Sequence, residues 1–169
     1  MATVTLKGNK CRTSGSLPAV GKKAPAFTLT DGKLQDVKLS DFKGKKKIIS
    51  IVPSLDTGIC SMSTVKFNET ASKLRKTVVL VVSRDLPFAQ NRFCDANKTK
   101  KVVTLSEFRD RKFGEKYGME LSSGPMKGAL ARGIVVLDSN DKVVYTELVP
   151  EIAQEPDYDA AIAAVKAAK

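Results

Sequence analysis

Cys60 lies where a chain commonly activates a thiol. The apolar run over 48–52 predicts a buried strand, Pro53 begins a turn, and the residues from Ser61 onward predict a helix. The N–H groups in the first turn of a helix have no intrahelical partner, and the helix dipole favours negative charge there. A cysteine at that place is favoured as the thiolate, the nucleophilic form of sulfur. Residues 53–60 therefore predict a reactive thiol.

The chain has no histidine, which limits how this thiol can be activated. Cys–His and Ser–His nucleophile pairs are excluded, so activation must come from a helix terminus, hydroxyl groups or a fixed cation. The three cysteines, Cys11, Cys60 and Cys94, are too few and too scattered for a disulfide scaffold, and no two have metal-ligand spacing. We expect no metal and no cofactor. We also expect Cys11 to take no part in the chemistry.

Length and composition predict one soluble domain over residues 1–169, in which 42% of the residues are hydrophobic. The net charge of +11 predicts a solvated basic surface, because only 6% of the residues are aromatic and no nucleic-acid-binding module is present. We expect no specific nucleic-acid partner. The sequence has no apolar run of about 20 residues and no secretory signal pattern, so we expect a cytoplasmic protein without membrane association.

The order of expected elements predicts an α/β fold. A hairpin is expected within residues 1–16, with Cys11 on its second strand. We expect strands over 26–30, 37–39, 47–52, 77–82, 102–105, 133–137 and 142–146, a helical turn at 40–42, and helices over 61–75, 86–96, 106–117 and 157–168. Alternating strands and helices followed by a hairpin and a final helix indicate a mixed central sheet flanked by helices, in a thioredoxin-like order.

Three separated motifs resemble one family. The pattern Pro53-x-x-x-Thr57-x-x-Cys60 is similar to the active site of peroxiredoxins, and the full string over 53–60 resembles that of thiol peroxidases, the atypical two-cysteine peroxiredoxins. The segment 83–94, ending in Cys94, resembles the resolving-cysteine segment of that subfamily. The segment 128–132, ending in Arg132, is the third match. The resemblance covers about residues 17–166.

This resemblance implies a role for each matched residue. Cys60 would be the peroxidatic nucleophile, and Thr57 would place its hydroxyl beside the sulfur. Pro53, which has no N–H, would shield the thiolate. Arg132 would stabilise the thiolate and hold the peroxide oxygens. Cys94 would be the resolving thiol, which condenses with a Cys60 sulfenic acid to give an intramolecular disulfide.

The resemblance further implies hydrogen peroxide and alkyl hydroperoxides as substrates, thioredoxin as reductant, and a homodimer. Two other readings stay open at the level of sequence. A general thiol–disulfide oxidoreductase is disfavoured because the chain has no Cys-x-x-Cys motif. A redox sensor or holdase would use the same cysteines to signal oxidation. Peroxide turnover with a thioredoxin system distinguishes these alternatives.

Overall fold

A seven-stranded mixed sheet organises the chain, which a computed structural model describes over residues 1–169. The strands of this sheet, in spatial order, are β4 (Asp36–Lys38), β3 (Thr28–Thr30), β7 (Val103–Ser106), β6 (Thr77–Ser83), β5 (Lys46–Ile51), β8 (Gly133–Leu137) and β9 (Val143–Leu148). The three central strands β5, β6 and β7 are parallel, and β8 runs antiparallel to β5. The predicted thioredoxin-like fold with a mixed sheet is confirmed.

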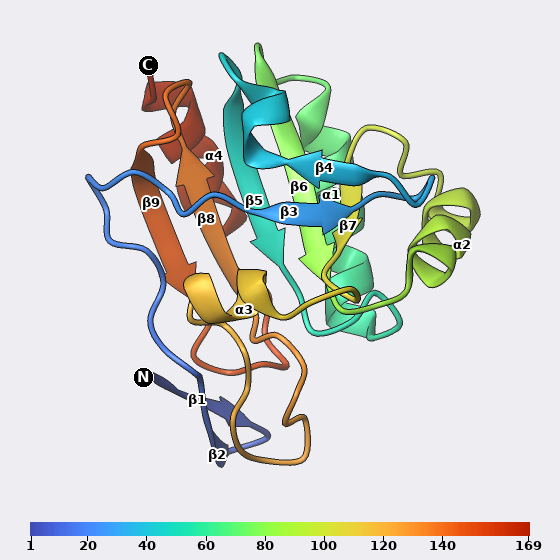
Figure 1. Ribbon diagram of the computed structural model, residues 1–169, viewed down its shortest axis with the longest axis vertical. Helices are drawn as coiled ribbons and strands as arrows, with labels where there is room; N and C mark the ends of the chain where they lie inside the picture. Colours follow the sequence, from blue (N-terminus) through green and yellow to red (C-terminus); the bar gives the residue numbers. More distant parts are fainter.

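Helices cover both faces of this sheet. The helices are η1 (Leu39–Phe42, a 3₁₀ turn), α1 (Gly58–Ala71), α2 (Pro87–Asn97), α3 (Lys112–Lys116) and α4 (Tyr158–Ala167). Figure 1 shows α1 and α4 behind the sheet and α3 in front of it. The expected N-terminal hairpin is also present, as β1 (Thr3–Leu6) paired with β2 (Asn9–Arg12) in a separate sheet. None of the helices combines the length and the apolar character that a membrane crossing requires.

The period-two alternation of the strands divides the core into two apolar clusters. Along β6, Val79 and Val81 belong to the cluster under α1 and α4, whereas Leu80 and Val82 belong to the cluster on the opposite face. Strands buried on both faces read as continuous apolar runs, which is why their positions were predictable from sequence. Cys60 lies in the first of these clusters.

One predicted helix is largely absent. The segment 106–117 was expected to be helical, but β7 extends to Ser106 and a helix forms only from Lys112. Tertiary hydrogen bonds explain the difference. The N–H of Glu107 donates to Ser83 O at 3.1 Å, which continues the alignment of the chain with β6. The Glu107 carboxylate is buried and accepts from Arg84 Nε at 2.5 Å.

Candidate active site

Cys60 is the third residue of α1, and its side chain is fully buried. The helix begins at Gly58, three residues earlier than the sequence predicted, and Cys60 lies within its first turn. Its carbonyl accepts from Ser63 Oγ at 3.1 Å and from Thr64 Oγ1 at 2.9 Å. Cys60 belongs to the apolar cluster that α1 covers. It lies at the N-terminal end of α1, where the helix dipole favours negative charge.

Thr57 caps this helix by position but not through its side chain. Its backbone is extended, and it is the N-cap residue of α1. The Thr57 hydroxyl donates to Ser54 O at 3.0 Å. A hydroxyl carries one proton, so in this conformation Thr57 does not also donate to the sulfur of Cys60. The O–H group has to turn away from Ser54 O before it can donate to the sulfur as the resemblance implies.

Pro53 lies at the junction between β5 and this loop. The preceding residue, Val52, still donates its N–H to Val82 O at 3.0 Å. Pro53 is buried and has no N–H, so it ends the ladder with β6 without leaving an unpaired donor. The chain then leaves the sheet toward α1, which places Cys60 beyond the carboxyl end of a central parallel strand.

The loop between Pro53 and α1 is held by a carboxylate from the next strand connection. Asp85 accepts from Ser54 Oγ at 2.7 Å and from the Leu55 N–H at 2.8 Å. It also accepts from Ser83 Oγ at 2.8 Å. Because Asp85 lies between β6 and α2, these bonds join the loop that precedes Cys60 to the connection that precedes Cys94.

Arg132 is nearly buried immediately before β8. Its side chain is 3% exposed, and its Nε donates to Ile152 O at 2.9 Å. The Nη1 group is buried without a hydrogen-bond partner. A buried guanidinium donor that no protein atom satisfies is uncommon and indicates a site for a ligand acceptor.

Strand alternation shows on which side of the sheet this guanidinium lies. Ile134 and Val136 of β8 belong to the apolar cluster that contains Cys60, whereas Val135 and Leu137 belong to the opposite cluster. Arg132 is two residues before Ile134, so its side chain leaves the backbone on the same face of the sheet as Cys60.

Cys94 is in the last turn of α2, and its side chain is half-buried. Its sulfur lies 4.0 Å from Thr104 Oγ1, and it packs against the same apolar cluster that contains Cys60. The helix ends at Lys98, whose left-handed backbone (φ 55°) directs its N–H to Cys94 O. All three cysteines are free, so the structure holds Cys60 and Cys94 as separate thiols on intact helices. Cys11 is fully buried in the N-terminal hairpin.

Sequence reasoning missed the side chains that support this site. Gln90 of α2 donates through Nε2 to Ser83 Oγ at 3.1 Å and to Leu105 O at 3.0 Å, which fixes α2 against two strands. Arg84 donates to the carbonyl of Gly128 and to Glu120 Oε2, so it fixes the segment that leads to Arg132. The signal for Arg84 was its place, together with Asp85, in a pair of charged residues directly after a buried strand.

Three kinds of comparison bear on what this site does. A family model described as Redoxin matches residues 19–162. A thiol peroxidase of Mycobacterium tuberculosis is 54% identical over 167 residues, which cover 99% of this chain and 100% of that protein, and the same figures hold for a thiol peroxidase of Mycobacterium bovis.

Solved structures agree with these sequence matches. The crystal structure of a peroxiredoxin-like protein from Aquifex aeolicus superposes with a TM-score of 0.92 at 42% identity, covering 98% of this chain and 96% of that one. A thiol peroxidase from Chromobacterium violaceum has a TM-score of 0.90 at 21% identity, covers 98% of this chain and 96% of that one, and supports the fold alone. With a buried helix-terminal cysteine, a free guanidinium donor on the same face of the sheet, and relatives of this identity over nearly the whole length, the chain belongs to the thiol peroxidase family of redoxins.

Proposed function

We propose that this member of the thiol peroxidase family reduces hydrogen peroxide and organic hydroperoxides, with alkyl hydroperoxides favoured, through Cys60 and Cys94. The observation that carries the proposal is the pairing of a buried cysteine in the first turn of α1 with an unsatisfied Arg132 Nη1 on the same face. A peroxide oxygen supplies the acceptor that Nη1 lacks. The role of the guanidinium is to stabilise the negative charge that develops on the leaving oxygen.

The first step is a displacement at oxygen. The Cys60 thiolate attacks the terminal oxygen of ROOH, an S–O bond forms and the O–O bond breaks. The sulfur is oxidised to sulfenic acid, and the peroxide is reduced to RO⁻, which takes up a proton and leaves as ROH. Pro53 presents no N–H that would attract water to the sulfur, and Thr57 donates to the sulfur or the peroxide once its O–H group turns away from Ser54 O.

The second step forms the disulfide. Cys94 attacks the Cys60 sulfenic acid, an S–S bond forms, and water leaves. We expect both cysteines to leave their helices in part, so that their Cα atoms come within the roughly 7 Å that disulfide geometry allows. The last turn of α2 suits this step, because it is followed by Lys98 in the left-handed conformation (φ 55°). That conformation is unfavourable for a residue with a Cβ atom. A dithiol reductant then reduces the disulfide and regenerates both thiols.

We further propose thioredoxin as that reductant, a homodimer as the assembly, and the cytoplasm as the compartment. Three free cysteines suit a reducing compartment. Exposed apolar side chains at Met62, Leu86 and Phe88, on and next to α1 and α2, support an association surface near the site. Sedimentation analysis of the reduced protein tests the dimer.

The decisive experiment is peroxide consumption coupled to thioredoxin, thioredoxin reductase and NADPH. The wild-type protein should turn over many equivalents of cumene hydroperoxide, and Cys60→Ser should have no turnover. Oxidation of one equivalent without turnover would instead indicate a redox sensor. Reduction of insulin disulfides without peroxide consumption would indicate a general oxidoreductase. Full turnover by Cys60→Ser would rule out the proposed nucleophile.

A further inference from the structure

A pocket of about 500 Å³ lies on the face of the sheet opposite to Cys60. It is formed where the segment leading into β3, the η1 turn, the helix α3 and the turn between β8 and β9 meet. This volume is within the range of pockets that bind small molecules. Nothing in the peroxidase chemistry derived above uses it.

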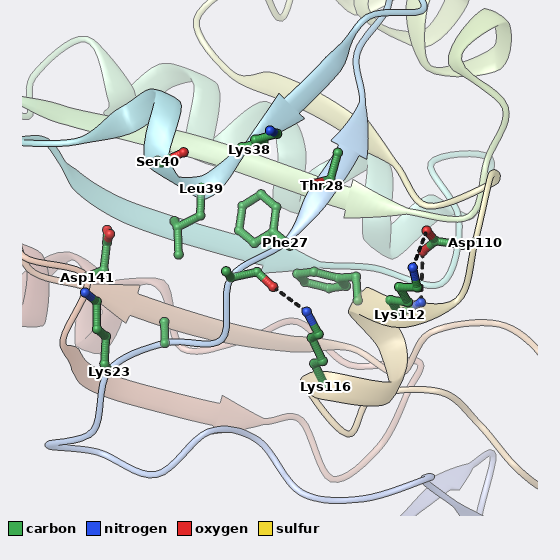
Figure 2. A pocket seen from close by; sticks show the side chains of 13 residues that line it. Lys23, Phe27, Thr28, Lys38, Leu39, Ser40, Asp110, Lys112, Lys116 and Asp141 are labelled. Carbon is green, nitrogen blue, oxygen red and sulfur yellow. Dashed lines mark hydrogen bonds and ion pairs between the residues drawn. The ribbon is translucent and has the colours of Figure 1, made fainter.

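The floor of this pocket is apolar. Phe27, Leu39 and Phe113 line it, and each of these side chains is almost completely buried. The rings of Phe27 and Phe113 meet edge to face, with centroids 5.6 Å apart. Figure 2 shows Phe27 and Leu39 in the middle, with Lys38 and Ser40 on one side and Lys116 on the other. Such a floor offers dispersion contacts to a small apolar group.

The rim is predominantly cationic. Four lysines and two aspartates line the pocket, which leaves an excess of two positive charges: Lys23, Lys38, Lys112, Lys116, Asp110 and Asp141. The lysines come from separate parts of the chain. Lys23 precedes β3, Lys38 ends β4, and the other two belong to α3. In Figure 2 Lys23 and Asp141 lie at one end of the pocket, and Lys112 and Asp110 lie at the other.

The two aspartates do not neutralise these lysines fully. Asp141 is bound by Lys47 at 2.5 Å, and the Lys47 side chain is completely buried. The charge of Asp141 is therefore paired with an ammonium group that is not one of the four lining lysines. Asp110 is 4.0 Å from Lys112, and no carboxylate lies within ion-pair distance of Lys23 or Lys38.

We propose that this pocket binds small organic anions. The apolar part of the ligand, an aromatic ring or a short alkyl chain, packs on Phe27 and Leu39, and its carboxylate, sulfonate or phosphate is held by the lysine rim. Lysine binds such groups as a point charge, so the site selects for charge and an apolar body rather than for one anion geometry. Because the pocket and Cys60 lie on opposite faces of the sheet, this binding does not depend on the peroxidase reaction.

The probe for the test is 8-anilinonaphthalene-1-sulfonate, an aromatic anion whose fluorescence rises in apolar surroundings. The Lys23→Gln/Lys38→Gln double variant should bind it about fivefold more weakly than the wild type, because two screened charge contacts are lost. A Lys100→Gln/Lys166→Gln variant has the same net charge, with both substitutions at exposed positions outside the pocket. Its affinity should equal that of the wild type. An equal loss in both double variants would overturn the proposal.

A second variant separates the pocket from general surface charge. Thr28 is exposed on β3 and lines the pocket, so Thr28→Trp should fill the space without changing the charge. It should abolish the fluorescence increase, and two-dimensional NMR of the wild type should show probe-induced shifts around Phe27, Leu39 and Phe113. Unchanged binding by Thr28→Trp, or shifts located elsewhere on the surface, would contradict the assignment. Thermal unfolding of each variant checks that the fold is retained.

Discussion

Asp85 and Ser54 are joined by a 2.7 Å hydrogen bond between the carboxylate and the Oγ hydroxyl. The bond spans two connections of the central sheet, since Ser54 follows β5 and Asp85 follows β6. One connection leads to the helix of Cys60 and the other to the helix of Cys94. The same carboxylate also accepts the Leu55 N–H, so a single side chain maintains the relative position of the two thiol-bearing segments.

Asp85→Asn should therefore disturb the site more than the fold. Hydrogen bonds to a charged group are worth about 1.5–3 kcal/mol, and the amide keeps only one acceptor oxygen. We expect the free energy of unfolding to fall by about 2 kcal/mol, and the rate of Cys60 oxidation to fall as the loop becomes less ordered. Stopped-flow oxidation and urea unfolding measure the two effects. Asp95→Asn, on the exposed face of α2, is the matched control and should change neither.

Cys94→Ser tests the resolving step. This variant should reduce one equivalent of peroxide per chain and then stop, because the Cys60 sulfenic acid has no thiol partner. Intact mass spectrometry should show a gain of oxygen in Cys94→Ser and a loss of two hydrogens in the wild type. Hydrogen exchange at the first turn of α1 and the last turn of α2 should increase in the oxidised wild type. Identical exchange in the reduced and oxidised proteins would contradict the proposed unwinding.

Arg132 provides a test of the electrostatic role. Loss of one preorganised donor to a developing oxyanion typically lowers the rate by about 100-fold or more. Arg132→Met should therefore lower the second-order rate constant with peroxide by about 100-fold. Arg132→Lys keeps the charge but loses the planar fork and the bond to Ile152 O, and it should recover only part of the rate. A Met variant that reacts at the wild-type rate would exclude Arg132 from the reaction.

Glu151 should make the N-terminal hairpin sensitive to acid. Its carboxylate accepts from the Thr5 hydroxyl at 2.7 Å and from the Lys7 N–H at 2.9 Å. These bonds lower the pKa of Glu151 from an ordinary 4.5 to about 2. A carboxylate whose pKa is lower in the folded state stabilises that state above pH 4.5, and the contribution is lost as the pH falls toward 2.

NMR of the Lys7 and Gly8 amides measures this transition. Their shifts should titrate with a midpoint near the pKa of about 2 given for Glu151. In Glu151→Gln the titration should disappear, and the hairpin amides should exchange faster at neutral pH. A midpoint at the ordinary glutamate value would show that these hydrogen bonds do not persist in solution.

The sequence predicted the parts of the fold that local patterns determine. The buried strands β5, β6 and β8 read as continuous apolar runs, and the helix after Pro53 followed from its helical spacing. The segment after Ser106 was predicted wrongly because its conformation depends on distant partners: Glu107 is bound by Arg84, which lies on another connection. Helical propensity in that segment is weaker than these buried charged hydrogen bonds.

The candidate site was predictable in its residues but not in its arrangement. Motifs identified Cys60, Cys94 and Arg132, yet no local pattern predicts the hydrogen bond from Arg132 Nε to Ile152 O that holds the buried guanidinium. The Thr57 hydroxyl was expected to act on the sulfur, and in this structure it donates its proton to Ser54 O. A hydrogen bond of this kind depends on where a backbone carbonyl lies, which the sequence does not display.

The order of strands in the sheet has a consequence for synthesis of the chain. The central strand β5 pairs with β6 on one edge and with β8 on the other. During translation β6 and β7 emerge soon after β5, but β8 emerges only after the long connection that contains α3. A nascent chain stopped before β8 therefore has Ile48 and Ile49 on an open strand edge. The sheet cannot be completed until β8 is available, and until then the free edge of β5 is a surface on which another strand can pair.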